Sequence, residues 1–185
     1  IPHFFLVGTS AFFPTLIFED AETEQGWSLG IPGDNATAGI WIRDEPIGTW
    51  EGLEPVQPDE DHSPTGSMCF VTGNAPFDGS NTGAGDVDGG RTTLESPVYP
   101  IPPGISPVIS FWRWYSNDLG DTPAQDNWEV QIRDQNNVWI SLEKTTQSDN
   151  SWTEHQFLAK HIFEQPNQLQ FRFIAEDLPG GSVVE

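Results

Sequence analysis

Alternation of apolar and polar residues recurs through the second half of the chain and predicts β-strands. In residues 127–133 (NWEVQIR) every second side chain is apolar, and the same holds for 168–175 (QLQFRFIA). The stretch 108–116 (VISFWRWYS) places Phe111 on one face and Trp112 on the other. Period-two patterns of this kind are typical of half-buried strands that pack as two antiparallel sheets.

Clusters of Gly, Pro, Asn and Asp separate the predicted strands and indicate turn-rich loops. Residues 137–145 (NVWISLEKT) form another predicted strand, and 151–166 hold a strand or a single helical turn. Residues 96–107 (SPVYPIPPGISP) are excluded from the interior of a sheet, because proline donates no ladder hydrogen bond. We therefore expect an all-β protein, a two-sheet antiparallel sandwich.

The first residues, IPHFFLVGTSAFFPTLIF, are almost free of charge and contain a strand-length apolar run. They lack the basic region of a signal peptide and are too short and proline-broken to span a bilayer, so no membrane insertion is expected. A start at Ile1 favours a processed chain, either a mature secreted protein or a trimmed fragment. The apolar side chains expected at a subunit interface are Phe4, Phe5, Leu6, Val7, Phe12 and Phe13.

The formal net charge of −21, with seven Lys and Arg residues, excludes nucleic acid and anionic membranes as partners. It is typical of a solvated acidic surface in salty or extracellular surroundings. The single cysteine, Cys69, forms no intrachain disulfide and is predicted to be a buried thiol. The H-E-x-x-H, G-x-S-x-G and P-loop motifs are absent, so we expect no enzyme, and one Cys with four scattered His gives no zinc spacing.

Several segments, taken in order, resemble the MAM-type jelly-roll domains. The segments are IFEDAETEQGW (17–27), DHSPTGSMCF (61–70), GGRTTLESPV (89–98), ISFWRWYSND (109–118), WISLEKT with SWTEHQF (139–157) and QLQFRFIAEDLPGGSVVE (168–185). The sequence is similar above all to the related jelly rolls appended to secreted bacterial peptidases and surface proteins. The resemblance covers residues 17–185 and implies a non-catalytic extracellular domain for adhesion, oligomerisation or ligand binding, often with a structural calcium.

The chain departs from this family pattern at both ends. Family members usually close with one more strand after the position of S-V-V, whereas residues 1–16 here are additional. We therefore divide the chain into an apolar extension, 1–16, and a jelly roll lacking its usual last strand, 17–185. An incomplete sandwich exposes a backbone edge that is a template for another strand.

This division leads to the hypothesis that the extension fills the empty slot of a neighbouring subunit, which is donor-strand complementation. Repeated head to tail, such a contact does not close and grows a fibre. Burial of about five apolar side chains would contribute on the order of 10 kcal/mol before ordering costs. Two alternatives stay open: the extension folds back onto its own domain, or the last strand lies outside a trimmed chain.

Loop carboxylates predict a structural calcium site. The resemblance implies Glu19 and Asp61 as ligands, while Asp20, Asp59 and Asp88 are candidates because calcium prefers carboxylate and carbonyl oxygens on loops. The D-x-D-G run at residues 86–89 is half of an EF-hand pattern, but the rest of that pattern is missing.

Exposed aromatics give the second functional hypothesis, a carbohydrate-binding or adhesive accessory module that takes a polysaccharide. The candidate residues for stacking against a sugar ring are Trp50, Trp112, Trp114 and Tyr115. For Trp112 and Trp114 the structural alternative is packing between the sheets. Asn35 lies in the sequon NAT and is a candidate glycosylation site. The preferred hypothesis is a subunit of a surface filament, extracellular or secreted.

Overall fold

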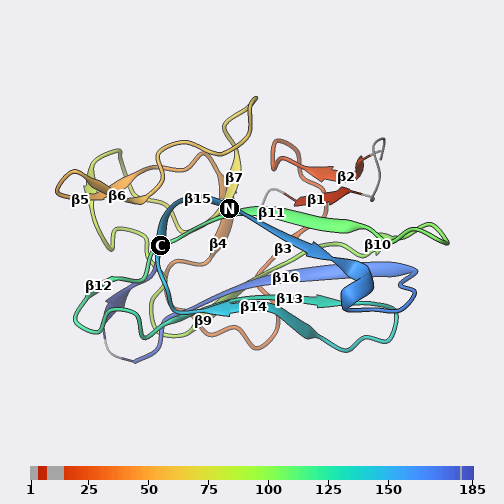
Figure 1. Cartoon of the computed structure of the whole chain (residues 1–185). Helices are drawn as coiled ribbons and strands as arrows, with labels where there is room; N and C mark the ends of the chain where they lie inside the picture. Colours follow the sequence, from red (N-terminus) through yellow and green to blue (C-terminus); the bar gives the residue numbers. More distant parts are fainter. Residues whose placement is uncertain (1–3, 8–14, 180) are drawn as a thin grey trace.

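The computed structural model describes residues 4–7, 15–179 and 181–185. Within these ranges the chain forms β-strands in several largely antiparallel sheets, with one 3₁₀ turn, η1 (Ala159–His161), and no α-helix. Figure 1 shows the two largest sheets lying one above the other as a β-sandwich. The all-β sandwich predicted from the alternation is confirmed at this level.

The larger layer is a six-stranded sheet in which the strand order is β14-β13-β16-β9-β3, with β10 also paired to β16. Its strands are β3 (Ser28–Leu29), β9 (Arg91–Glu95), β10 (Tyr99–Pro100), β13 (Asn127–Arg133), β14 (Ile140–Thr145) and β16 (Gln168–Glu176). The alternation placed these side chains correctly, since Val130 and Phe173 are both fully buried and lie opposite each other in the register. The proline-rich stretch contributes only two residues to the sheet, in β10.

The other layer is a four-stranded sheet with the order β15-β11-β1-β2. It consists of β1 (Phe4–Val7), β2 (Thr15–Glu19), β11 (Val108–Tyr115) and β15 (Asp149–Leu158). The long pair β11–β15 runs from Val108 opposite Leu158 to Tyr115 opposite Asp149, with a bulge near its end. Strand β15 leads directly into η1, so the predicted strand and the predicted helical turn both occur in this region.

Aromatic packing between the two layers forms the core. The Phe111 ring on β11 meets the Phe173 ring on β16 edge-on, with centroids 5.3 Å apart and an interplanar angle of 81°. Trp128 packs 6.1 Å from the same Phe173 ring. Edge-to-face contacts of this kind add to the apolar area that each ring removes from water.

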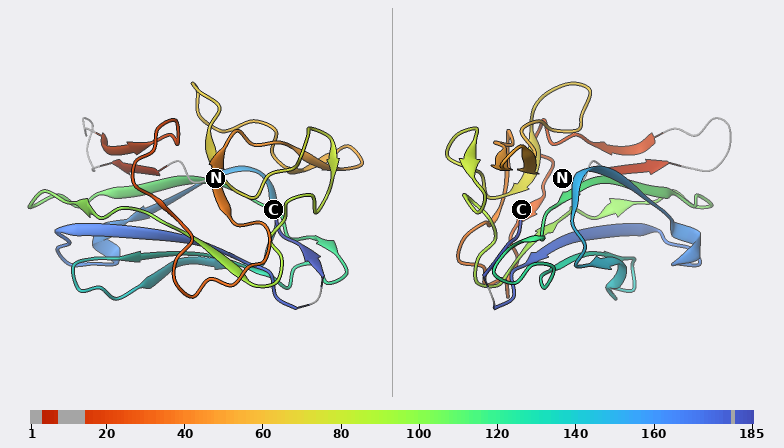
Figure 2. Two further views of the ribbon diagram at one scale, coloured as in Figure 1. Left: turned by 180° about the vertical axis from the view of Figure 1, so that it is seen from behind. Right: turned by 60° about the vertical axis from the view of Figure 1, so that its left-hand side comes forward.

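One end of the sandwich is covered by small sheets and loops, which lie to one side of the sandwich in Figure 2. The strands there are β4 (Trp41–Asp44), β5 (Thr49–Glu51), β6 (Glu54–Gln57), β7 (Cys69–Thr72), β8 (Ser80–Asn81), β12 (Leu119–Gly120) and β17 (Ser182–Val183). Loops approach closely here: Gly73 has φ +67°, and a Cβ on it would lie 2.1 Å from the Gly85 carbonyl oxygen. Cys69 is buried in β7, and burial raises the pKa of its thiol.

None of the helical structure in the described ranges is long and apolar enough to cross a membrane.

Candidate functional site

The N-terminal strand lies inside the chain's own sheet. Strand β1 pairs antiparallel with β11, where Phe5 lies opposite Ser110 and Val7 opposite Val108. On its other edge β1 pairs with β2. Of the predicted interface residues, Phe4–Val7 therefore form an inner strand, while Phe12 and Phe13 lie outside the described residues.

A second terminal segment pairs with the continuation of β11. In β17, Val183 lies opposite Leu119, and the backbone groups of Glu185 and Ser116 exchange two hydrogen bonds of 2.6 and 3.1 Å. Both β1 and the 182–185 segment are thus antiparallel to the continuous stretch 108–120 and run in the same direction. Between these two pairings, residues 111–115 pair only with β15 within the described part of the chain.

The side chain of Glu185 fixes this segment to the loops at the same end. Its carboxylate accepts hydrogen bonds from the Thr49 hydroxyl and from the Gly83 N–H, the latter at 2.8 Å. Burial raises the pKa of Glu185, against these two hydrogen bonds. Asp86 lies beside the segment and is also buried; burial, followed by the charges of Asp88, Glu185 and Asp177, raises the pKa of Asp86 to about 7.

The tryptophans of β11 lie on the outer face of the four-stranded sheet, beneath the loop that joins β6 to β7. The His62 ring of this loop stacks on Trp112 with centroids 3.7 Å apart. The indole N–H of Trp114 donates to the Val56 carbonyl at 2.6 Å. Both rings are partly buried, so neither the predicted open glycan platform nor packing between the sheets describes them.

The other two glycan candidates differ from each other in exposure. Tyr115 is 1% exposed and donates from its hydroxyl to the Asp126 carbonyl, so its ring belongs to the core and presents no surface to a sugar. The reason is the pleat of β11, which turns Tyr115 inward with Phe111. Trp50 is 37% exposed on the β5–β6 hairpin. Asn35 is exposed, and its amide oxygen accepts from the Arg91 N–H.

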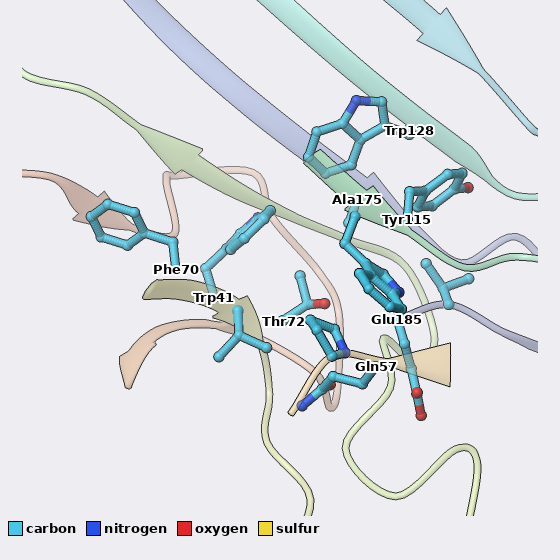
Figure 3. A pocket seen from close by; sticks show the side chains of 12 residues that line it. Trp41, Gln57, Phe70, Thr72, Tyr115, Trp128, Ala175 and Glu185 are labelled. Carbon is cyan, nitrogen blue, oxygen red and sulfur yellow. The ribbon is translucent and has the colours of Figure 1, made fainter. Parts of the chain in front are cut away.

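A small cavity lies at the end of the core where these elements meet, lined by aromatic rings that include Trp41, Tyr115 and Trp128 (Figure 3). Gln57 and Glu185 line the edge away from Trp128. Its volume is about 30 Å³, which is room for roughly one water molecule. A sugar ring or an organic cofactor does not fit.

The predicted calcium ligands do not all come together: Asp59 and Asp61 line one pocket, and Glu19 is not among the residues that line it. Glu19 is fully buried, and its two carboxylate oxygens accept from the Ala21 N–H, the Gln25 amide and the Trp27 indole N–H. The Arg43 guanidinium lies nearby and donates to the Ala21 carbonyl at 2.8 Å, so a cation already occupies this region. These surroundings do not fit a calcium ion at Glu19.

The remaining carboxylates hold loops in place. Asp20 accepts from the Glu22 N–H, Asp59 from the Gly48 N–H, and Asp61 from Ser63. Asp88 is exposed and contributes its carbonyl to the Thr37 N–H. Within the described residues, no three His, Cys, Asp or Glu side chains are grouped so that they could hold a metal ion. Calcium therefore stays a prediction from the resemblance and the charge.

Two clusters of polar side chains were not predicted from the sequence. Arg113 is buried between the layers, where its Nη2 lies 3.2 Å from Glu143 and its Nε donates to the His155 Nε2 at 3.3 Å. On the outer face of the six-stranded sheet, Arg133 and Arg172 both lie over the Trp139 ring. The alternation turns Arg133 and Arg172 to the same face, but only the sheet register brings them next to each other.

The chain matches no known family model, no curated protein and no solved structure.

Proposed function

We propose that this protein is a non-catalytic extracellular module of jelly-roll type that assembles with copies of itself by exchange of its N-terminal strand. The placement of β1 supports this proposal. It is an inner strand between β11 and β2, and it pairs with three residues of β11. A strand in this position leaves an open edge on both neighbours when it departs, and such an edge recruits another strand.

Exchange requires that β1 of another chain can occupy the position between β11 and β2 without a change in those two strands. The antiparallel pairing of β1 with β11 depends on the local register, and an identical β1 from a second copy satisfies the same backbone groups. Each copy would then give one strand and receive one. Repeated head to tail, such a contact is heterologous and extends into a filament when the rotation between copies does not close a ring, whereas reciprocal exchange between two copies gives a closed dimer.

A cross-linking experiment separates exchange from self-complementation. One variant carries Phe5→Cys and the other Ser110→Cys, because these residues are register partners. After refolding of the mixture under mild oxidation, strand exchange predicts a disulfide-linked heterodimer. If the strand stays in its own chain, the mixture gives no cross-link, whereas the double variant gives an internal one.

Two controls make this result specific. Leu6→Cys mixed with Ser110→Cys should give little product, because the register places Leu6 opposite Ile109, one position away from Ser110. The native Cys69 is buried, and its raised pKa keeps it as an unreactive thiol. Deletion of residues 1–14 should abolish both the cross-link and any filaments seen by electron microscopy.

Glycan binding is the second candidate, and the exposed ring of Trp50 is the observation that favours it. We propose the hairpin around Trp50 as the platform, since the tryptophans of β11 are covered. Trp50→Ala should abolish binding to a polysaccharide array without a change in melting temperature, and Trp112→Ala serves as the comparison. Equal binding by the wild type and Trp50→Ala would exclude this platform.

A further inference from the structure

The outer face of the six-stranded sheet carries a pair of arginines on one tryptophan. The guanidinium carbon of Arg133, on β13, lies 4.5 Å from the centroid of the Trp139 ring. That of Arg172, on β16, lies 4.3 Å from the same centroid. Cation–π contacts at these distances hold both guanidinium groups in place at the surface.

Neighbouring glutamines fix the orientation of the two arginines. Arg133 donates from Nε and Nη2 to the Gln170 side-chain oxygen at 2.9 and 2.6 Å. Arg172 donates from Nε to the Gln131 side-chain oxygen at 2.7 Å. The two guanidiniums are therefore preorganised, which lowers the entropy that a partner's carboxylate would have to remove.

Within the described part of the chain, neither arginine forms a direct ion pair with a carboxylate, although the charges of Glu95 and Glu129 act on Arg172 from nearby. Among the described residues, the ion pairs of the neighbouring cations are Arg91 with Asp34 and Lys144 with Glu129, and none involves Arg133 or Arg172. Two oriented arginine forks that form no direct ion pair within the described chain are suited to an acidic group from outside it.

The charges of this sheet face cancel, whereas those of the rest of the molecule do not. The face carries four cations, Arg91, Arg133, Lys144 and Arg172, and four acids, Asp34, Glu95, Glu129 and Glu176. The chain has seven Lys and Arg residues and 28 Asp and Glu residues. Outside this face three cations and 24 acids remain, so the rest of the molecule carries the whole net charge of −21. Copies of so acidic a protein repel one another least where this face takes part.

The opposite side of the sandwich carries a pocket of the complementary charge. Glu45, Asp59, Glu60 and Asp61 line a polar pocket of about 340 Å³. This pocket belongs to the β6–β7 loop, which is fixed to the outer face of the four-stranded sheet by the Trp152 indole donating to the Glu60 carbonyl. Figures 1 and 2 show the two sheets as opposite layers, so the arginine pair and the acidic pocket face away from each other.

We propose that the Arg133–Arg172 pair docks the acidic pocket of a second copy of this chain, so that successive copies stack face to back. The contact joins two different surfaces on opposite sides of the sandwich, so each docked copy leaves a free surface at which the next copy adds in the same direction. It rests on the proposed self-assembly and supplies a second contact beside the exchanged strand. The charge of the two surfaces also sets the order of the copies, because two acidic pockets repel each other.

The test compares charge-neutral variants by sedimentation velocity at low ionic strength. Arg133→Gln with Arg172→Gln should weaken assembly about tenfold, the scale of two surface ion pairs. Glu45→Gln with Glu60→Gln should weaken it to a similar extent. The matched control, Arg91→Gln with Lys144→Gln, removes the same charge from the same face but from paired cations, and should have a much smaller effect.

A charge-swap mixture identifies the occupant. Arg133→Glu with Arg172→Glu should not stack alone, nor should Glu45→Lys with Glu60→Lys, but the mixture of the two should assemble. No assembly in the mixture, or an effect of the arginine variant without one of the acidic-pocket variant, overturns the proposal and indicates another anionic partner. Circular dichroism confirms that each variant is folded, and Arg133→Lys with Arg172→Lys, which keeps the charge, should retain most of the assembly.

The two proposals fail in different ways. The Phe5→Cys and Ser110→Cys cross-link reports strand exchange and can be combined with the arginine variants. If the cross-link forms and assembly does not respond to the arginines, stacking is overturned while strand exchange stands. If neither a cross-link nor any oligomer forms, both are overturned.

Discussion

Neutralisation of Asp86 should change the dependence of stability on pH. Its folded pKa of about 7 lies above the ordinary value of 3.8, because burial and three nearby carboxylates disfavour the ionised form. Because the pKa of Asp86 is higher in the folded protein, Asp86 loses its proton at a lower pH in the unfolded chain than in the folded one. The stabilising contribution is therefore complete below pH 3.8 and is lost as the pH rises through 7.

The expected magnitude follows from this shift. Each pKa unit corresponds to about 1.4 kcal/mol, so the rise from pH 5 to the folded pKa of about 7 removes up to about 3 kcal/mol of unfolding free energy. Above pH 7 the loss levels off. Asp86→Asn keeps the shape of the protonated carboxyl and cannot ionise, so it should abolish this loss and be the more stable protein at pH 8.

Urea denaturation at pH 5 and pH 8, for the wild type and Asp86→Asn, measures the difference directly. Other titrating groups are common to both proteins and cancel in the comparison. Asp78→Asn, at an exposed loop residue, is the matched control and should follow the wild type. If the wild type and Asp86→Asn lose the same stability between the two pH values, the assignment of a proton to Asp86 is refuted.

Three further changes test other features of the structure. Gly73→Ala should prevent stable folding, because the new Cβ would lie 2.1 Å from the Gly85 carbonyl oxygen; expression with a normal melting curve would contradict this. Trp112→Ala should leave the sandwich folded but free the loop that His62 fixes, seen as faster proteolysis within that loop and unchanged thermal unfolding elsewhere. His155→Gln should reduce the loss of stability in acid, because burial lowers the pKa of His155: the stabilising contribution of the neutral imidazole is complete above pH 6.5 and is lost as the pH falls through the folded pKa. An equally steep loss in both proteins, measured by urea denaturation, would refute this.

The faces of the long strands could be predicted from the sequence because alternation reports directly on burial in a sandwich. Trp128, Val130 and Ile132 are all buried, and Phe171 and Phe173 are buried on the next strand. The same pattern on β11 separates the inward and outward side chains correctly. Local period-two spacing is therefore sufficient where a strand has one core face.

The surroundings of the outward face could not be predicted in the same way. The alternation places Trp112 outside, but the loop that covers it comes from about fifty residues earlier in the chain, and its His62 carries no local signal for stacking. The separation of Glu19 from the candidate calcium ligands Asp59 and Asp61 has a related reason. Glu19 accepts a hydrogen bond from Trp27, and Arg43, whose charge acts on Glu19, is likewise distant in sequence.

The Arg133–Arg172 pair shows what register adds to pattern. Each arginine is simply a polar residue in an alternating strand, and the residues are far apart in sequence. They become neighbours because β13 and β16 pair with Gln131 opposite Arg172 and Arg133 opposite Gln170. Sequence alone fixes the face of each side chain but not its neighbours across the sheet.

The pairing of β1 with β11 has a consequence for the order of events during synthesis. Strand β1 leaves the ribosome about a hundred residues before Val108–Ser110, its partners on β11. At ordinary translation rates of about 5–20 residues per second, the edge of β1 that pairs with β11 stays without that partner for several seconds. Under the proposed strand exchange, the chain with which β1 pairs after that interval would depend on how many neighbouring chains are close. Crowded synthesis would favour linked copies and dilute synthesis single ones, so the assembly state would record the conditions under which each chain was made.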